Sequence, residues 1–481
     1  MKKKEALALK LPFEPGESLC TWVVPGLEGE PVELSGLLTL EVGKYPYGVL
    51  YGDMPIEWVD GAASFPQRHR FESLVGRLSS GGSVALMNGE LHYWFETQGR
   101  ATGAFAVLSR DQLDAKKPRK YKAIELQIDG IDAIMGKSPI SQVKMPRKAG
   151  DEPVWSASIN RDANAEWESA GDQLSVWFNA SIRALDFYEF SMVFGSVLRI
   201  TVKDALTVDE WWLEWVRPLR QLISLVTQGS RSINGFLAVQ GESNKAGSRD
   251  QVFGWDISQS PRNTSRDEIE ATQTLVNLAA DEANLLLLLQ SWRTLSTAHH
   301  PLLETYGSMT TTAEQHPRSR LLLLLQALEG LYGFETSDQR AKNEQIYTEK
   351  REGVLKRAGE SSLETADVKF LKKHVMKRPS SGLLDALGAI FKSLPVDIRP
   401  ELDTTSLFAT VRSLDPTLDK ERAERILVKI RNDLSHGSAN YDVQDLKHVA
   451  DLLERVVRSE TLRVIGAPES SRKRALENAN D

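Results

Sequence analysis

The first half of the chain alternates short apolar runs with turns that are rich in glycine and charged residues. The apolar runs are enriched in β-branched and aromatic residues, which is the pattern of β-strands. It predicts strands at residues 33–43, 48–52, 83–96, 103–110, 121–131, 154–159, 174–182 and 191–202. Strands at this spacing are typical of a sandwich or a barrel. Most aromatic residues lie in this half, where they form either the core or a surface that stacks on a ligand.

A helical pattern interrupts the strands over residues 207–228. Thr207 is suited to the N-cap, acidic residues follow in the first turn, and the apolar positions have helical spacing. Pro218 is expected to kink this helix because it has no backbone N–H to donate. Two further strands, at 235–241 and 251–258, indicate that the β domain continues past the helix.

Helical periodicity dominates the second half. The polar loop 258–268 is the predicted domain boundary. After it the apolar spacing predicts helices at residues 269–296, 318–333, 364–376, 381–394, 403–413, 419–437 and 442–466. Short connections between helices favour an antiparallel bundle.

The expected fold class is therefore α+β. A β-rich N-terminal domain, sandwich- or barrel-like, occupies residues 1–258, and an all-α helical domain occupies residues 269–466. The polar tail at 467–481 is expected to be disordered, because it has too few apolar residues to bury.

The chain has 481 residues, enough for two or three domains, and a formal net charge of -7. A nucleic acid would therefore need a local basic patch, since no global basic surface is present. Residues 340–378 hold 11 Lys and Arg against 6 Asp and Glu, a local charge of +5. This segment is either a solvated helical face or a rim that follows phosphates.

Cysteine usage and hydropathy favour a cytoplasmic protein without a membrane partner. Cys20 is the only cysteine, so neither an internal disulfide nor a cysteine-bound metal is expected. Glu5 and Lys10 interrupt the apolar start, and the leucine runs at 285–289 and 321–325 are too short to span a bilayer. The chain also has no P-loop, HExxH or GxSxG motif, and no cofactor or metal is expected.

The most distinctive polar motif is RNDLSHG, residues 431–437. Gly437 is suited to stop the preceding helix, which places Arg431, Asn432 and His436 at its end. The apolar stripe of this helix is expected to face the bundle through Ile426, Leu427, Ile430 and Leu434. On an ideal helix, side chains five residues apart point about 140° away from each other. Arg431 and His436 converge only if the last turn unwinds or a neighbouring subunit completes the site.

These residue types suit the cleavage of a phosphodiester. Histidine transfers protons near neutral pH, and arginine offers a permanent charge and several donors for a phosphate oxygen. In RNA the 2′-hydroxyl supplies an internal nucleophile, so such a site needs neither a metal nor a protein nucleophile. Spacing alone leaves open the alternative that Arg431 and His436 belong to a polar surface turn.

The motif R-x4-H, with a polar residue directly after the arginine, resembles that of the HEPN ribonuclease superfamily. A β-rich half followed by WWLEWVRPLRQLISLVTQG (211–229), RSRLLLLLQALEGLYG (318–333) and IRNDLSHG (430–437) resembles the ApeA-like proteins. These are single-chain bacterial anti-phage proteins that join an ApeA-type N-terminal domain to a HEPN domain. The resemblance covers most of the chain. It implies a metal-independent endoribonuclease that acts in abortive infection and is latent until the N-terminal domain senses the phage.

The resemblance also implies residue roles and partners. Arg431 would bind the scissile phosphate, His436 would transfer a proton or contact the phosphate, and Asn432 would help to orient the site. Glu329 would either orient the arginine or serve only the structure. HEPN domains commonly dimerise, so two motifs would face each other in a homodimer or a higher homo-oligomer.

RNA is the expected substrate, with transfer RNA one candidate beside messenger and ribosomal RNA. A phage-derived trigger is the expected partner: a phage protein is the first candidate, and a nucleotide or another small ligand is the alternative. The alternative function is that of a non-catalytic HEPN scaffold or a partner of a toxin.

Overall fold

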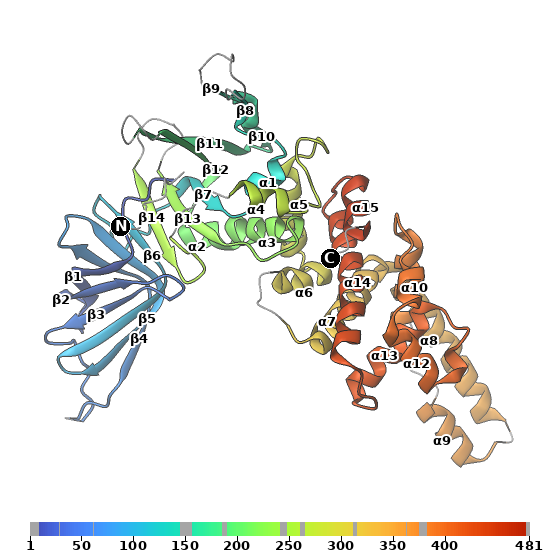
Figure 1. Ribbon diagram of the computed structural model, residues 1–481. Coiled ribbons are helices and arrows are strands. Elements are labelled where there is room, and N and C mark those ends of the chain that lie inside the picture. The colour runs from blue at the N-terminus through green and yellow to red at the C-terminus, as the bar shows by residue number, and fades with distance from the viewer. Residues whose placement is uncertain are drawn as a thin grey trace, which may run out of the picture. The chain divides into compact units, whose positions relative to one another are not determined.

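The computed structural model describes residues 9–27, 29–60, 62–144, 156–184, 190–240, 248–259, 265–310, 315–361, 363–374 and 382–477. The chain divides into two compact units, residues 1–293 and 294–481. The first unit is rich in strands and the second is helical, which confirms the predicted α+β class (Figure 1).

Six strands of the first unit close into a barrel. They are β1 (Gly16–Pro25), β2 (Pro31–Leu40), β3 (Tyr47–Tyr51), β4 (Gln67–Leu78), β5 (Ser83–Phe95) and β6 (Gln98–Ser109). The ring has the order β6-β3-β2-β1-β4-β5 and closes because β5 also pairs with β6. Trp22 is fully buried in its core. A Cβ atom at Gly48 would overlap the Trp22 ring, so a glycine is needed where this large side chain meets β3.

Six more strands continue the sheet outward from β6. Their order from β6 is β14 (Arg249–Gly254), β13 (Ile233–Val239), β7 (Tyr121–Ile128), β12 (Phe190–Leu206), β11 (Asp172–Ala184) and β10 (Ala165–Ser169). A separate small sheet pairs β8 (Ile140–Lys144) with β9 (Ser156–Ile159), and α1 (Ile131–Met135) follows β7. The sequence predictions missed β1, β4, β8 and β10. In β4 the burial alternates, but the first four residues, 67–70, are all polar, which removes the apolar signal from this end of the strand.

The helical segment after β12 starts as the sequence predicts. Thr207 caps α2 (Val208–Trp211) in a capping box with Glu210, whose carboxylate accepts the Thr207 backbone N–H at 2.7 Å. A π-helical turn (Trp212–Val216) then leads into α3 (Arg217–Val226). Pro218 lacks an N–H, so the regular hydrogen-bond ladder cannot continue through it, and the expected irregularity takes the form of this π turn. The indole N–H of Trp211 donates to the carbonyl of Tyr121 at 3.0 Å and joins α2 to the sheet.

The single helix predicted at 269–296 is wrong. The structure has α4 (Arg266–Ala271), a non-helical stretch, and then α5 (Leu285–Thr297). In the stretch between them, the N–H of Leu275 donates to Val226 and that of Leu278 donates to Ile134, both at 2.8 Å. These bonds to other elements replace the local helical bonds that the apolar periodicity favours. The division between the compact units falls within α5, whereas the predicted boundary was the loop 258–268.

The second unit is a helical bundle, as predicted. Its helices are α6 (Pro301–Met309), α7 (Pro317–Glu335), α8 (Ser337–Glu360), α9 (Thr365–His374), α10 (Leu383–Ser393), α11 (Arg399–Asp403), α12 (Ser406–Leu414), α13 (Ala423–His436), α14 (Val443–Val464) and α15 (Glu469–Glu477). Helices α7 and α14 pack on each other at its centre, and α6, α10 and α13 pack on α7. Within the described residues, no helix combines the length and the apolar character that a membrane crossing requires.

Two segments of this unit differ from the predictions. The basic stretch after α7 contains α8, a helix of 24 residues that the sequence did not single out. Helix α15 occupies residues 469–477 of the tail 467–481 that was predicted to be disordered, and residues 478–481 lie outside the described residues. Ser471, Ala475 and Leu476 are buried, and α15 packs on α14. This short polar segment is ordered by its packing on other parts of the unit. Its own composition does not predict that order.

Candidate active site

Helix α13 carries the RNDLSHG motif and ends where the sequence predicts. Its last residue is His436, and Gly437 adopts the left-handed conformation with a φ of 66°. The N–H groups of Gly437 and Ser438 both donate to the carbonyl of Asp433, which closes the helix end. The predicted apolar stripe is at most 2% exposed: Ile426, Leu427, Ile430 and Leu434. Burial of this stripe fixes which side of the helix faces the bundle and which side faces outward.

Three of the predicted site residues lie together, partly exposed, where α13 packs on α7. The Arg431 Nη2 atom lies 3.6 Å from Glu329 Oε2 on α7, and Arg431 Nη1 donates to Asn432 Oδ1 at 3.2 Å. The Arg431 side chain is 42% exposed and that of Glu329 is 34% exposed. A guanidinium has five N–H groups, so these two contacts orient it and leave donors for a ligand.

His436 stands apart from this group. The residue is exposed, and its ring makes no hydrogen bond or ion pair across the described parts of the chain. Helix α13 remains helical through His436, so the last turn does not unwind. On a regular helix this leaves Arg431 and His436 about 140° apart. Convergence through an unwound last turn is therefore not observed, and completion of the site by a neighbouring subunit stays a prediction.

A buried carboxylate that the sequence analysis missed fixes the loop after α13. Asp433 is 5% exposed. It accepts hydrogen bonds from Lys429 Nζ at 2.6 Å, Ser438 Oγ at 2.9 Å and the Tyr441 hydroxyl at 2.6 Å. The spacing of Lys429 and Asp433, four residues apart, was the signal in the sequence. Together these bonds hold residues 437–441 in place directly beside His436.

The electrostatics of this carboxylate follow from its partners. Burial alone would raise the pKa of Asp433, but the hydrogen bonds from Lys429, Tyr441 and Ser438 outweigh it and hold the pKa below its ordinary value. Burial and the bond to Asp433 raise the pKa of Tyr441. Asp433 therefore stays ionised at neutral pH and keeps all three partners.

The start of α7 also contributes to the end of α13. His316 is the N-cap of α7, and its Nδ1 atom accepts the backbone N–H of Arg318 at 3.3 Å. The guanidinium of Arg318 donates to the carbonyl of Leu434, one of the last carbonyls of α13 that have no partner within the helix. Helix α7 thus supports α13 at two points, through Arg318 and through Glu329.

One family model, described as ApeA N-terminal domain 1, matches residues 22–292, which is more than half of the chain. The match ends one residue before the end of the first compact unit, and the predicted boundary at 258–268 falls inside it. No curated protein and no solved structure matches the chain. The matched region does not include α7 or α13.

Proposed function

Because the chain belongs to the family of the ApeA N-terminal domain 1, which indicates an anti-phage defence protein, we propose that its helical unit is a HEPN-type, metal-independent endoribonuclease. The main support for the proposal is that the Arg431 guanidinium is oriented and still accessible to solvent. Glu329 and Asn432 orient this guanidinium, yet it is 42% exposed on the helix that ends at His436. An oriented cation with unused donors is suited to receive a phosphate.

The proposed reaction is transesterification within the RNA. The 2′-hydroxyl loses its proton as its oxygen bonds to phosphorus, the bond from phosphorus to the 5′-oxygen breaks, and that oxygen takes up a proton. Arg431 donates to the non-bridging phosphate oxygens and stabilises the charge that develops on them. His436 transfers a proton. The products carry a 2′,3′-cyclic phosphate and a 5′-hydroxyl.

The proposal includes a homodimer, because one regular α13 helix directs Arg431 and His436 to different sides. In a two-fold arrangement, Arg431 of one chain acts together with the partner subunit's His436. Co-expression of Arg431→Ala and His436→Ala chains tests this arrangement. A composite site predicts that the mixed dimer regains cleavage, since one wild-type arginine still meets one wild-type histidine. A mixture as inactive as either variant alone, at a subunit ratio confirmed by mass spectrometry, would refute the composite site.

The first experiment incubates total cellular RNA with the purified full-length chain in EDTA. We expect the wild type to leave cyclic phosphate ends and His436→Ala to leave the RNA intact. His448→Ala is the matched control, because His448 is also exposed but lies on α14 outside the motif. Equal cleavage by wild type and His436→Ala would contradict the assignment. If the wild type is inactive even with lysate from phage-infected cells, the non-catalytic scaffold is the better explanation.

A further inference from the structure

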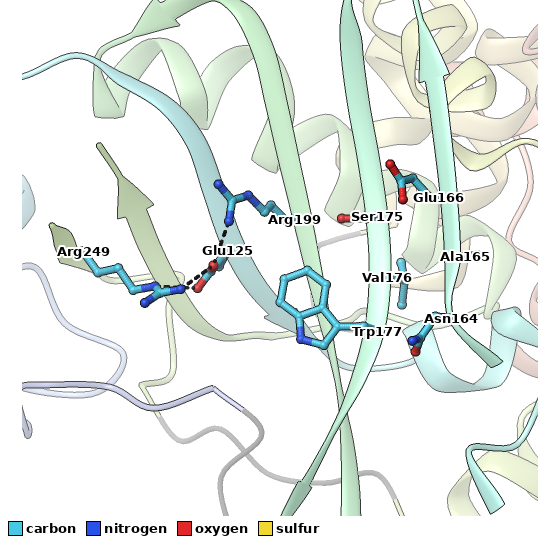
Figure 2. Close-up of a pocket in the computed structure, with 9 residues that line it drawn as sticks. All are labelled: Glu125, Asn164, Ala165, Glu166, Ser175, Val176, Trp177, Arg199 and Arg249. Atoms are coloured by element: carbon cyan, nitrogen blue, oxygen red, sulfur yellow. Dashed lines mark hydrogen bonds and ion pairs between the residues drawn. The ribbon is translucent and has the colours of Figure 1, made fainter. Parts of the chain in front are cut away.

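The strand-rich unit holds a pocket of about 590 Å³ that the proposed nuclease reaction does not use. It lies over strands β7, β10, β11, β12 and β14 (Figure 2). The register of these strands places a row of polar residues along the floor of the pocket. Glu166 lies opposite Ser175, Ser175 opposite Arg199, and Arg199 opposite Glu125, in one row across four strands. Residues directly opposite in a sheet share a face, so this row presents polar groups to the same side.

The floor of the pocket is a carboxylate between two guanidinium groups. Arg199 Nη1 donates to Glu125 at 3.4 Å, and Arg249 donates to Glu125 through Nε and Nη2, both at 3.1 Å (Figure 2). Glu125 and Arg199 are 4% and 6% exposed. Two positive charges and one negative charge leave this group with a net charge of +1. The Glu166 carboxylate, at the other end of the row, makes the lining neutral overall, so the positive charge is confined to the Glu125 end. Positive charge that lies at one end of a pocket favours an anion there.

Arg249 is the part of the floor that a ligand can reach. Its side chain is 43% exposed. Its Nε and Nη2 atoms bind Glu125, and its Nη1 atom has no acceptor in the described portion of the chain. The bidentate pair holds the guanidinium in one plane, so its free edge is oriented before any ligand arrives. A planar, oriented fork of donors suits phosphate oxygens.

Trp177 supplies a flat apolar surface in the same pocket. Its indole N–H donates to Asn179 at 3.0 Å, which fixes the ring, and the ring lies between the Glu125 group and Asn164 in Figure 2. Asn164 accepts the backbone N–H of Phe178 with its oxygen at 3.3 Å. Its amide NH2 group and the Ser175 hydroxyl have no partner among the residues that the structure describes. A fixed aromatic ring beside unused polar groups suits a planar, polar heterocycle.

We propose that this pocket binds a nucleotide. The phosphate contacts the free edge of Arg249, the base stacks on Trp177, and Asn164 and Ser175 bind polar atoms of the base or sugar. A nucleotide combines the anion, the planar ring and the length that the pocket needs, and the volume lies within the range of small-molecule sites. The inference goes beyond the proposed nuclease activity, because it assigns a small-molecule ligand to the other unit.

Isothermal titration calorimetry of the full-length chain tests the pocket. The probes are AMP, GMP, CMP and UMP, with inorganic phosphate and adenosine as separate parts of the ligand. We expect at least one mononucleotide to bind saturably and either part alone to bind at least about tenfold more weakly. Competition with a 5′-phosphorylated RNA tetranucleotide then distinguishes a free nucleotide from the end of a strand, since both carry the same group.

Variants locate the binding. Arg249→Gln and Trp177→Ala are each expected to weaken nucleotide binding about tenfold or more. Arg77→Gln is the matched control, because Arg77 is a half-exposed arginine on the barrel that pairs with Glu33 at 2.6 Å and lies outside the pocket. Circular dichroism confirms the fold of each variant. If Trp177→Ala fails to fold, Arg249→Gln carries the test alone, because the Arg249 side chain is partly exposed and Arg199 still donates to Glu125 after the substitution.

Any of three results would overturn the proposal. The first is the absence of saturable binding of any mononucleotide to the wild-type chain, and the second is binding that Arg249→Gln and Trp177→Ala leave unchanged. The third is phosphate that binds as tightly as the nucleotides, which would make the pocket a simple anion site. None of these measurements depends on RNA cleavage, so the pocket and the nuclease proposal can fail separately.

Discussion

Among the carboxylate and guanidinium groups of the helical unit, two clusters differ in burial and in how many of their hydrogen bonds are used. In the Glu454 cluster, Arg458 donates to Glu454 at 2.8 Å and to the Tyr306 hydroxyl at 3.0 Å, and Arg320 donates to Glu454 and to Asp451. In the Arg431 cluster, Arg431 meets Glu329 at 3.6 Å and Asn432 at 3.2 Å. The first cluster joins α6, α7 and α14 in the interior, and the second lies at the surface.

The difference in burial and bonding indicates a structural role for the Glu454 cluster and a ligand-binding role for the Arg431 cluster. Buried charges are tolerated when partners neutralise them, and removal of one partner is then costly. An exposed ion pair contributes little to stability because water screens it. Arg458 is thus bound to its neighbours on several sides, whereas Arg431 is oriented and still accessible. Four predictions test this comparison.

The largest expected effect is that of Arg458→Ala on stability. Removal of Arg458 leaves the Glu454 carboxylate with less compensation in the interior, and we expect a loss of about 3–5 kcal/mol in the free energy of unfolding. Urea unfolding of the full-length chain, followed by far-UV circular dichroism, measures it. Arg431→Ala is the control and should change stability by less than about 1 kcal/mol. Equal losses in the two variants would remove the distinction between the clusters.

The second prediction concerns RNA cleavage instead of stability, and here Arg431 is expected to matter more than Arg458. Arg431→Ala should lower RNA cleavage about 100- to 1,000-fold, which is typical for the loss of one donor to a developing oxyanion. Single-turnover cleavage in EDTA, scored by the cyclic phosphate ends, measures the rate. Exposed Arg425 on the same helix, which pairs with Glu421 at 2.8 Å, gives the control variant Arg425→Ala. A cleavage rate that both substitutions reduce equally would assign no special role to Arg431.

The third prediction concerns Asp433, which is buried like Glu454 but lies beside the exposed site. Asp433→Asn weakens its bonds to Lys429, Ser438 and Tyr441 and should cost about 1–3 kcal/mol at neutral pH. Because the folded-state pKa of Asp433 is depressed, its stabilisation is complete above the unfolded value near 4 and is lost as the pH falls through the folded value. The difference in unfolding free energy between wild type and Asp433→Asn should therefore shrink below about pH 4. A difference that stays constant with pH would show that the charge of Asp433 has no part in it.

The smallest expected effect is that of Glu329→Gln. The amide keeps the shape of the side chain and loses the charge that orients Arg431, so cleavage should fall about tenfold while stability changes by less than about 1 kcal/mol. The cleavage assay and urea unfolding measure the two quantities on one preparation. Glu335, on the same helix, pairs with Arg463 at 2.6 Å, so Glu335→Gln serves as the control. Wild-type activity in Glu329→Gln would leave Glu329 with a structural role only.

Local patterns predicted much of the fold and part of the site. The strands and helices with strong periodicity were found, because their burial repeats along the chain at the period of the element. Helix α13 and its end at His436 were predicted for the same reason, together with Gly437. Strand β4 and helix α15 were missed, because their order depends on neighbours and their own residues are largely polar. The predicted domains 1–258 and 269–466 stay a prediction, as do the homodimer and the RNA substrate.

Contacts between distant residues explain the rest. Glu329 and Arg431 are about a hundred positions apart, and only the packing of α7 on α13 brings them within 3.6 Å. The group formed by Glu125, Arg199 and Arg249 depends on the register of strands from four parts of the chain. The periodicity of apolar residues within one helix or strand does not show which distant segments will lie side by side.

The sequence by itself thus determined the α+β class, the start of α2 at Thr207, and the end of α13, because capping residues and apolar periodicity act within a few positions of one another. Tertiary structure decided the closure of the barrel through β5 and β6, the non-helical stretch before α5, the order of α15 and the position of Glu329 beside Arg431. In each of these cases the deciding hydrogen bonds or buried surfaces join segments whose proximity depends on how the whole unit packs.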